Sequence, residues 1–219
     1  MPASPICSEA RRSRWWSPVP AWVGARPRAF HGWLVPLAVL STALIASVVP
    51  ASAQGTITQA EALSLAFPGA SSIERRTAFL DERQLAAARA AAGTGIRIEP
   101  PVVTYYVGKS GTRSVGVAYF DSHRVRTMPE VAMIVVAPNG TVQRIEILSF
   151  AEPPEYRPPG AWLKLFQGKA LSPGLLVRRD IRNLSGATLT SRAVTEATRR
   201  VLALHNVIAP FSAPPGETR

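Results

Sequence analysis

Cysteine is almost absent from this chain of 219 residues, whose single example is Cys7 near the N-terminus. The remainder therefore offers no disulfide, no thiolate nucleophile and no cysteine-ligated metal. The lack of a C-x-x-C-H sequence excludes covalently attached haem. A chain with so little cysteine loses nothing by folding in an oxidising compartment.

Histidine is also scarce, since the chain holds only His31, His123 and His205, far apart in sequence. A catalytic triad needs a histidine within reach of an acid and a nucleophile, and no spacing here indicates one. The sequence also lacks an H-E-x-x-H motif, a Gly-rich dinucleotide fingerprint and a phosphate-binding loop. Glu152 and Glu155 share one loop, where solvated charges are the simpler interpretation. We predict no catalytic residues and no metal ligands.

The chain has an excess of positive charge, with a formal net charge of +11. Part of it belongs to residues 1–53, which contain five arginines and one glutamate. The excess in the remainder fits phosphates, acidic surfaces or anionic lipid heads. It is scattered and has few aromatic residues interleaved with it, so we predict no nucleic-acid binding.

Residues 1–53 have the pattern of an export signal. A basic region precedes the apolar run from Trp33 to Val49, and Pro50-Ala51-Ser52-Ala53 follows. This order predicts a secretory signal peptide cleaved after Ala53. The alternative is an uncleaved N-terminal anchor, since about 17 apolar residues lie near the lower limit for spanning a bilayer. Either way we expect the remainder in the periplasm or at the extracytoplasmic face of the inner membrane.

Residues 56–92 have helical signals, and we treat residues 54–101 as a helical lead-in. Thr58 followed by Glu61 forms a capping-box pattern, and Pro68-Gly69 is a stop signal. An Ala-rich run from Leu80 to Ala92 predicts a second helix that ends at Gly93.

The middle of the chain has the pattern of an antiparallel sheet. β-branched and aromatic runs predict strands, and Pro138-Asn139-Gly140 is a hairpin signal. Helices before and after these runs indicate an α+β fold with an antiparallel sheet of about four or five strands. The predicted strands are 102–107, 115–120, 131–137 and 142–150, with a last short strand at Leu175–Val177.

The C-terminal third is predicted to be mostly loop and helix. Four prolines in residues 151–160 argue against regular structure there, and the loop is either a binding loop or a stiff connector. A short helix is expected from Ala161 to Phe166. Apolar residues at helical spacing predict a final helix from about Thr190 to Leu204. Residues 206–219 are expected to be a flexible tail.

The stretch Leu184–Ser191 is rich in small and hydroxylated residues and lies just before the final helix. One interpretation is structural, with Thr190 or Ser191 capping the helix. The other is functional, because the N–H groups at a helix N-terminus favour phosphate. An exposed hydroxyl on this tight turn could then form a phosphodiester.

Ser185-Gly186-Ala187-Thr188-Leu189-Thr190-Ser191, followed by Arg192-Ala193-Val194, resembles the flavinylation motif of the FMN-binding domain family. That family occurs in the C subunit of the sodium-translocating NADH:quinone oxidoreductase, the G subunit of the Rnf complex and small exported flavoproteins. The resemblance extends over roughly residues 57–205. It includes the strand–turn–strand unit at 131–150, the acidic Glu152-Pro153, and the W…F-x-G-K segment of Trp162, Phe166 and Gly168-Lys169.

The resemblance implies that residues 102–205 form the FMN-binding core and that Thr188 carries FMN through a phosphoester bond. An FAD-dependent flavin transferase would install it with Mg²⁺ outside the cytoplasm, releasing AMP. The expected partners are this transferase and redox proteins, among them a membrane electron-transport complex. The candidate cofactor-binding residues are Thr188, Ser185, Gly186, Ala187, Thr190, Glu152, Trp162, Lys169 and Leu175.

The sequence departs from the family motif at Arg182, where the family usually has Asp. Asp180 could take its place, or Arg182 could pair with phosphate.

The export pattern and the family resemblance together lead us to expect an exported, FMN-binding electron-transfer protein rather than a stand-alone enzyme. Two alternatives stay open, namely an exported binding or structural domain without a cofactor, and a flavin-dependent reductase.

Overall fold

The structure is a computed structural model that describes residues 57–99 and 101–212. The expected signal peptide or anchor, and the last residues of the expected tail, lie outside these ranges. Among the described residues, no helix is both long and apolar enough to cross a bilayer.

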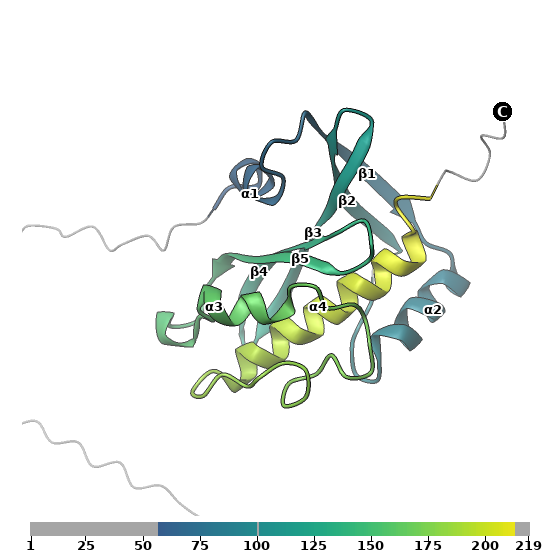
Figure 1. The fold of residues 1–219 in the computed structure, drawn as a ribbon. Helices are drawn as coiled ribbons and strands as arrows, with labels where there is room; N and C mark the ends of the chain where they lie inside the picture. The colour runs from purple at the N-terminus through teal and green to yellow at the C-terminus, as the bar shows by residue number, and fades with distance from the viewer. Residues whose placement is uncertain (1–56, 100, 213–219) are drawn as a thin grey trace, which may run out of the picture. The chain divides into compact units, whose positions relative to one another are not determined.

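A five-stranded antiparallel sheet forms the centre of the described chain (Figure 1). Its strands follow one another in chain order, each hydrogen-bonded to the next. The sheet, with helices before and after it, confirms the predicted α+β fold. The strands are β1 (Ser72–Phe79), β2 (Val102–Ser110), β3 (Arg113–Val125), β4 (Met128–Val136) and β5 (Val142–Phe150).

The fifth strand is β1, within the region that we expected to be a helical lead-in. Its sequence is mostly polar, and only Ala78 packs against the main core. β1 is an edge strand held by continuous pairing with β2, so its apolar residues show no alternation that sequence analysis could detect.

The strand predicted at Leu175–Val177 is absent, since only an isolated bridge joins Val177 to Ile181.

Both predicted N-terminal helices are present. α1 (Gln59–Ala66) begins with the expected capping box, in which Thr58 and Glu61 bond each other's backbone N–H groups. α2 (Glu82–Ala92) begins with a second capping box from Asp81 and Gln84. It ends at Gly93, whose φ of 100° lies in the region that favours glycine.

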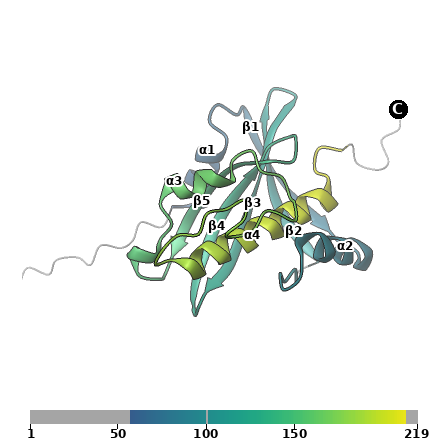
Figure 2. The same cartoon turned by 60° about the horizontal axis from the view of Figure 1, so that its bottom comes forward.

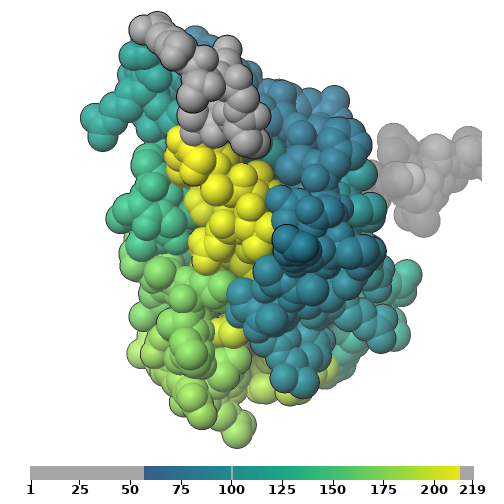
Figure 3. All heavy atoms as spheres, turned by 90° about the vertical axis from the view of Figure 1, so that its right-hand side faces the viewer, coloured from purple at the N-terminus to yellow at the C-terminus, as the bar shows by residue number. Residues whose placement is uncertain are grey.

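The helices cover the two faces of the sheet (Figures 1 and 2). The long helix α4 (Thr188–Ile208) crosses one face and α2 packs beside it (Figure 3), over a core that includes Ile134, Phe166 and Leu202. α1 covers part of the other face, where Phe67 and Met133 belong to a smaller cluster. The main core therefore lies between the sheet and α4.

The β3–β4 hairpin is longer than the predicted strands, and its turn lies at Arg126 and Thr127. The first of these strands was predicted to end at Phe120, just before the polar residues Asp121 to Arg124. In the structure Asp121 and Glu130 are buried, so the hairpin continues with polar residues facing inward.

The proline-rich segment 151–160 contains a turn of 3₁₀ helix at Pro154–Tyr156 (η1), which corrects the expectation of no regular structure. A short helix follows as predicted, composed of α3 (Gly160–Leu163) and the 3₁₀ turn η2 (Lys164–Phe166). A chain reversal at Gly168, with φ of 74°, then ends this region.

Candidate functional site

The turn before α4 exposes the hydroxyl-bearing side chain of Thr188. Gly186 has φ of 81°, and Ala187 N–H donates to the Leu184 carbonyl at 3.0 Å, which closes a tight turn. Ala187 is the N-cap residue and Thr188 is the first residue of a 21-residue helix. Thr188 thus lies on an exposed turn at the positive end of the helix dipole.

The structure corrects our structural interpretation of this turn. No side chain caps α4, because its N-cap residue is Ala187 rather than Thr190 or Ser191. Thr190 and Ser191 are buried in the first helical turn. The Ser191 hydroxyl donates to the Ala187 carbonyl at 3.0 Å and accepts from Leu184 N–H at 3.2 Å, which stabilises the turn from inside. The N–H groups of the first helical turn therefore donate to no capping side chain in the described part of the chain, and such free donors suit an anion.

Asn183 fixes the Thr188 side chain. Its Nδ2 donates a hydrogen bond to Thr188 Oγ1 at 3.1 Å. The amide oxygen of Asn183 is buried and has no hydrogen-bond partner among the described residues. Sequence analysis did not single out Asn183, since it has no separate signal beyond its position five residues before Thr188.

A cavity of about 210 Å³ opens beside Thr188. Three separate segments line it, namely the β3–β4 turn, the loop after β5 and the beginning of α4. The lining residues are Val125, Arg126, Glu152, Tyr156, Gly186, Ala187, Thr188, Leu189 and Thr190. The structure therefore brings together five of the nine predicted residues, which are Glu152, Gly186, Ala187, Thr188 and Thr190.

Arg126 and Tyr156 form a wall of the cavity that the sequence did not predict. The Arg126 guanidinium carbon lies 5.5 Å from the centroid of the Tyr156 ring, a cation–π contact. Arg126 adopts a left-handed φ of 52°, at the tip of the hairpin. Its positive charge adds to the partial charge of the helix end, so this wall favours an anionic group such as phosphate.

Glu152 supplies an acceptor on the same cavity. Its side chain is 7% exposed, and Oε1 has no hydrogen-bond partner among the described residues. A buried carboxylate oxygen without a donor is costly, so a ligand with an N–H or O–H group there would be favourable. The site thus combines cationic groups, an exposed hydroxyl and an unpaired acceptor, which fits the phosphate and hydrogen-bonding groups of FMN.

The other four predicted residues do not line this cavity. Trp162 is buried, and its indole N–H donates to the Arg182 carbonyl at 2.6 Å. Leu175 is fully buried in the main core, and the Lys169 carbonyl accepts from Val142 N–H at 2.9 Å. Ser185 is exposed beside the turn. A role for them in binding a cofactor stays a prediction, although Trp162 clearly holds the segment before Thr188.

Neither Asp180 nor Arg182, the two residues at the departure from the family motif, lines the Thr188 cavity. The Asp180 carboxylate lies 3.5 Å from the Ser172 hydroxyl and packs against Gly174, where an added Cβ would come within 2.9 Å of it. The Arg182 side chain is exposed, while its carbonyl accepts from Trp162. The contacts of Asp180 thus stabilise the loop before the turn, and Asn183 is the residue that touches Thr188.

Part of the chain is similar to known proteins. Residues 128–203, from the first residue of β4 into α4, match the sequence profile of a family described as the FMN-binding domain. No curated protein sequence matches the chain. A similar solved structure is the crystal structure of Shewanella oneidensis NqrC, with a TM-score of 0.46 and 16% identity over 64% of this chain and 85% of that chain. The profile match confirms, over residues 128–203, the resemblance to the FMN-binding domain family that was inferred from the sequence.

Proposed function

We propose that this chain is an exported electron-transfer protein that carries FMN on Thr188 through a phosphoester bond. The observation that carries the proposal is the exposed Thr188 hydroxyl at the start of α4, facing a cavity that also contains Arg126 and Glu152. A family match alone supports FMN binding, while this geometry supports the specific point of attachment.

Each group of the cavity has a distinct part in this function. The helix N-terminus and Arg126 would offset the charge of the phosphate. Glu152 Oε1 would accept a hydrogen bond from the ligand, and the Tyr156 ring would provide an aromatic wall. FMN, when bound, supplies one- and two-electron redox chemistry, and the protein sets its position and environment.

Attachment requires Thr188 Oγ1 to form a bond to the phosphorus of the FMN half of FAD. The bond between that phosphorus and the oxygen of the AMP half breaks, AMP leaves, and the hydroxyl proton passes to a base. The flavin transferase would supply FAD, Mg²⁺ and this base. Asn183 supports the step because its amide donates to Thr188 Oγ1, which leaves the hydroxyl hydrogen free and stabilises the charge that develops on oxygen.

In an extracytoplasmic location, a covalent bond would prevent loss of the cofactor. A carrier that faces a dilute exterior loses a reversibly bound cofactor, whereas a phosphoester retains it. Electrons would pass between redox proteins, among them a membrane electron-transport complex. The N-terminal export pattern and the near absence of cysteine support this location.

The test is co-expression of the chain with a flavin transferase, followed by a denaturing gel viewed under ultraviolet light. Flavin fluorescence should remain with the wild-type band, because denaturation releases only non-covalent FMN. Thr188→Ala should give a dark band, whereas Thr112→Ala, which removes an exposed hydroxyl in the turn between β2 and β3, should stay fluorescent. If the denatured wild-type band is dark while the native protein is yellow, FMN binds without the proposed bond.

A further inference from the structure

The sheet contains a slot where β2 and β3 separate. Pairing between them ends at Tyr105 and Tyr119. Beyond that point β2 stays paired with β1 as far as Val102, and β3 stays paired with β4 as far as Val125. Among residues 57–99 and 101–212, each strand therefore keeps one neighbour here and has a free edge that faces the slot, formed by residues 102–104 and 120–125.

The slot is a cavity of about 790 Å³, distinct from the one beside Thr188. Its apolar lining includes Val201 and Leu204 of α4 and the ring of Tyr106. Its volume exceeds that of the Thr188 cavity more than threefold. A cavity of this size admits a segment of several residues or a small ligand.

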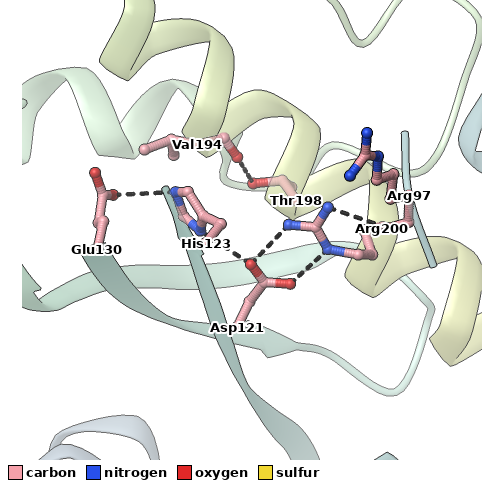
Figure 4. Close-up of polar contacts among 7 residues, drawn as sticks. All are labelled: Arg97, Asp121, His123, Glu130, Val194, Thr198 and Arg200. Atoms are coloured by element: carbon pink, nitrogen blue, oxygen red, sulfur yellow. Dashed lines mark hydrogen bonds and ion pairs between the residues drawn. The ribbon is translucent and has the colours of Figure 1, made fainter. Parts of the chain in front are cut away.

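Buried ionic contacts hold one wall of the slot rigid (Figure 4). Arg200 on α4 binds both carboxylate oxygens of Asp121 on β3, at 2.7 and 2.8 Å. Asp121 also bonds His123 at 3.0 Å, and His123 Nε2 lies 3.7 Å from a carboxylate oxygen of Glu130. Burial alone would raise the pKa of Asp121, but the hydrogen bonds from Arg200 and His123 lower it, so Asp121 is ionised and the charge of Arg200 balances it.

The charge that remains on the slot is positive. Arg75 and Arg124 line it, and neither forms an ion pair with a carboxylate among the described residues. Arg97 lines it as well, with only a loose and exposed pair to Glu99 at 4.0 Å. An occupant with negative charge would therefore be attracted to this opening.

The rim of the slot adds an apolar contact surface. Phe79 is 77% exposed and lies opposite Val102 in the β1–β2 register, where Val102 is also exposed. Strand edges that lack a partner are templates for another strand, and exposed apolar side chains beside them add affinity. A small anion would use the arginines but neither the strand edges nor this apolar pair.

We propose that the slot binds an extended acidic segment of a partner protein as an added strand between β2 and β3. Its backbone would pair with the free edges at 102–104 and 120–125, and its acidic side chains would meet Arg75 and Arg124. Alternate side chains of the segment would face α4 through the sheet, over Val201 and Leu204. The proposal goes beyond the electron-transfer function and holds whether or not FMN is covalently attached.

The probe is a fluorescent peptide of seven residues that alternates Glu and Val and is capped at both ends. We expect the purified chain to bind it, and Arg75→Glu/Arg124→Glu to weaken binding at least tenfold. Arg83→Glu/Arg179→Glu makes the same charge change on exposed residues outside the slot, and it should change the affinity less than twofold. Arg75→Gln/Arg124→Gln, with a smaller loss of affinity, covers the case in which the Glu pair fails to fold.

Amide hydrogen exchange separates a bound strand from simple charge attraction. Binding of the peptide should slow amide exchange in segments 102–104 and 120–125. N-methylation of alternate peptide groups in the probe should abolish this protection, because the probe then loses its backbone donors. Equal weakening by both double Glu variants would overturn the proposal, as would protection confined to other segments. Full displacement of the peptide by millimolar glutarate would also overturn it, because the slot would then be a site for small carboxylates.

Discussion

The Asn183 side-chain amide donates a hydrogen bond to the Thr188 hydroxyl oxygen at 3.1 Å. This bond joins the loop that Trp162 anchors to the first residue of α4. The hydroxyl is thereby oriented on an exposed turn beside a cavity that offers both a cation and a carboxylate.

Asn183→Leu keeps the size of the side chain and removes the donor to Thr188. One hydrogen bond to a developing charge contributes roughly 1.5 kcal/mol, so we expect flavin incorporation to slow by about tenfold. The measurement is the initial rate of covalent flavin transfer from FAD by a purified transferase. The thermal unfolding temperature serves as the control and should stay near that of the wild type. An unchanged rate would show that Asn183 has no part in attachment.

Arg126→Gln removes the cation opposite the start of α4. We expect non-covalent FMN to bind the Thr188→Ala background about tenfold more weakly when Arg126 is Gln, because the phosphate loses a charged partner. The affinity should also depend less on salt concentration. Arg179→Gln is the matched control on an exposed position outside the cavity. Equal affinities for the two variants, measured by flavin fluorescence quenching, would place the phosphate elsewhere.

Glu130→Gln tests the buried carboxyl that faces His123, Asp121 and Arg157. The side chain is 1% exposed, and burial raises its pKa to about 7 although the charge of His123 acts in the opposite direction. The folded state then binds more protons than the unfolded state between about pH 4.5 and pH 7, so this group makes stability fall as pH rises. Glu130→Gln should remove that fall and stabilise the protein at pH 8 by roughly 1–3 kcal/mol. Urea unfolding at pH 5 and pH 8 measures it, and an unchanged pH dependence would contradict the assignment.

His205→Gln tests a buried group whose contribution to the pH dependence of stability has the opposite sign to that of Glu130. His205 is buried, its Nδ1 lies 3.0 Å from the Tyr119 hydroxyl, and burial lowers its pKa to about 4. Between pH 6.5 and about pH 4 this histidine is protonated in the unfolded state but stays neutral in the folded state, so stability falls as pH decreases. His205→Gln should reduce that fall by about 1–3 kcal/mol, as measured by urea unfolding at pH 7 and pH 4.5. If wild type and variant lose the same stability, another group controls acid unfolding.

Local sequence signals predicted the parts of the fold whose cause is local. The capping box of Thr58 and Glu61, and the glycine that ends α2, were visible in the sequence and are present in the structure. β1 was missed because its stability comes from pairing with β2 rather than from an apolar pattern of its own. The β3–β4 extension was missed because Asp121 is buried only through its bonds with Arg200 and His123.

In the candidate site too, the residues with a local sequence signal were predicted and those brought in by the fold were not. The motif around Thr188 is contiguous, so the sequence alone located the turn and its hydroxyl. Arg126 and Tyr156 reach the same cavity from distant segments, and only the length of the β3–β4 hairpin and the path of the loop after β5 bring them there. Glu152 was predicted through the family resemblance, whereas no short-range pattern indicates that Arg126 would lie beside it.

The most direct test of the account is the intact mass of the exported protein made in a host with a flavin transferase. We predict a mass increase equal to one FMN less one water for the wild type and for Thr112→Ala, whose exposed hydroxyl lies outside the cavity, and no increase for Thr188→Ala. Thr188→Ser, which keeps a hydroxyl, should retain the modification. An unmodified wild type from such a host, or a Thr188→Ala variant that still carries the added mass, would contradict attachment of FMN to Thr188.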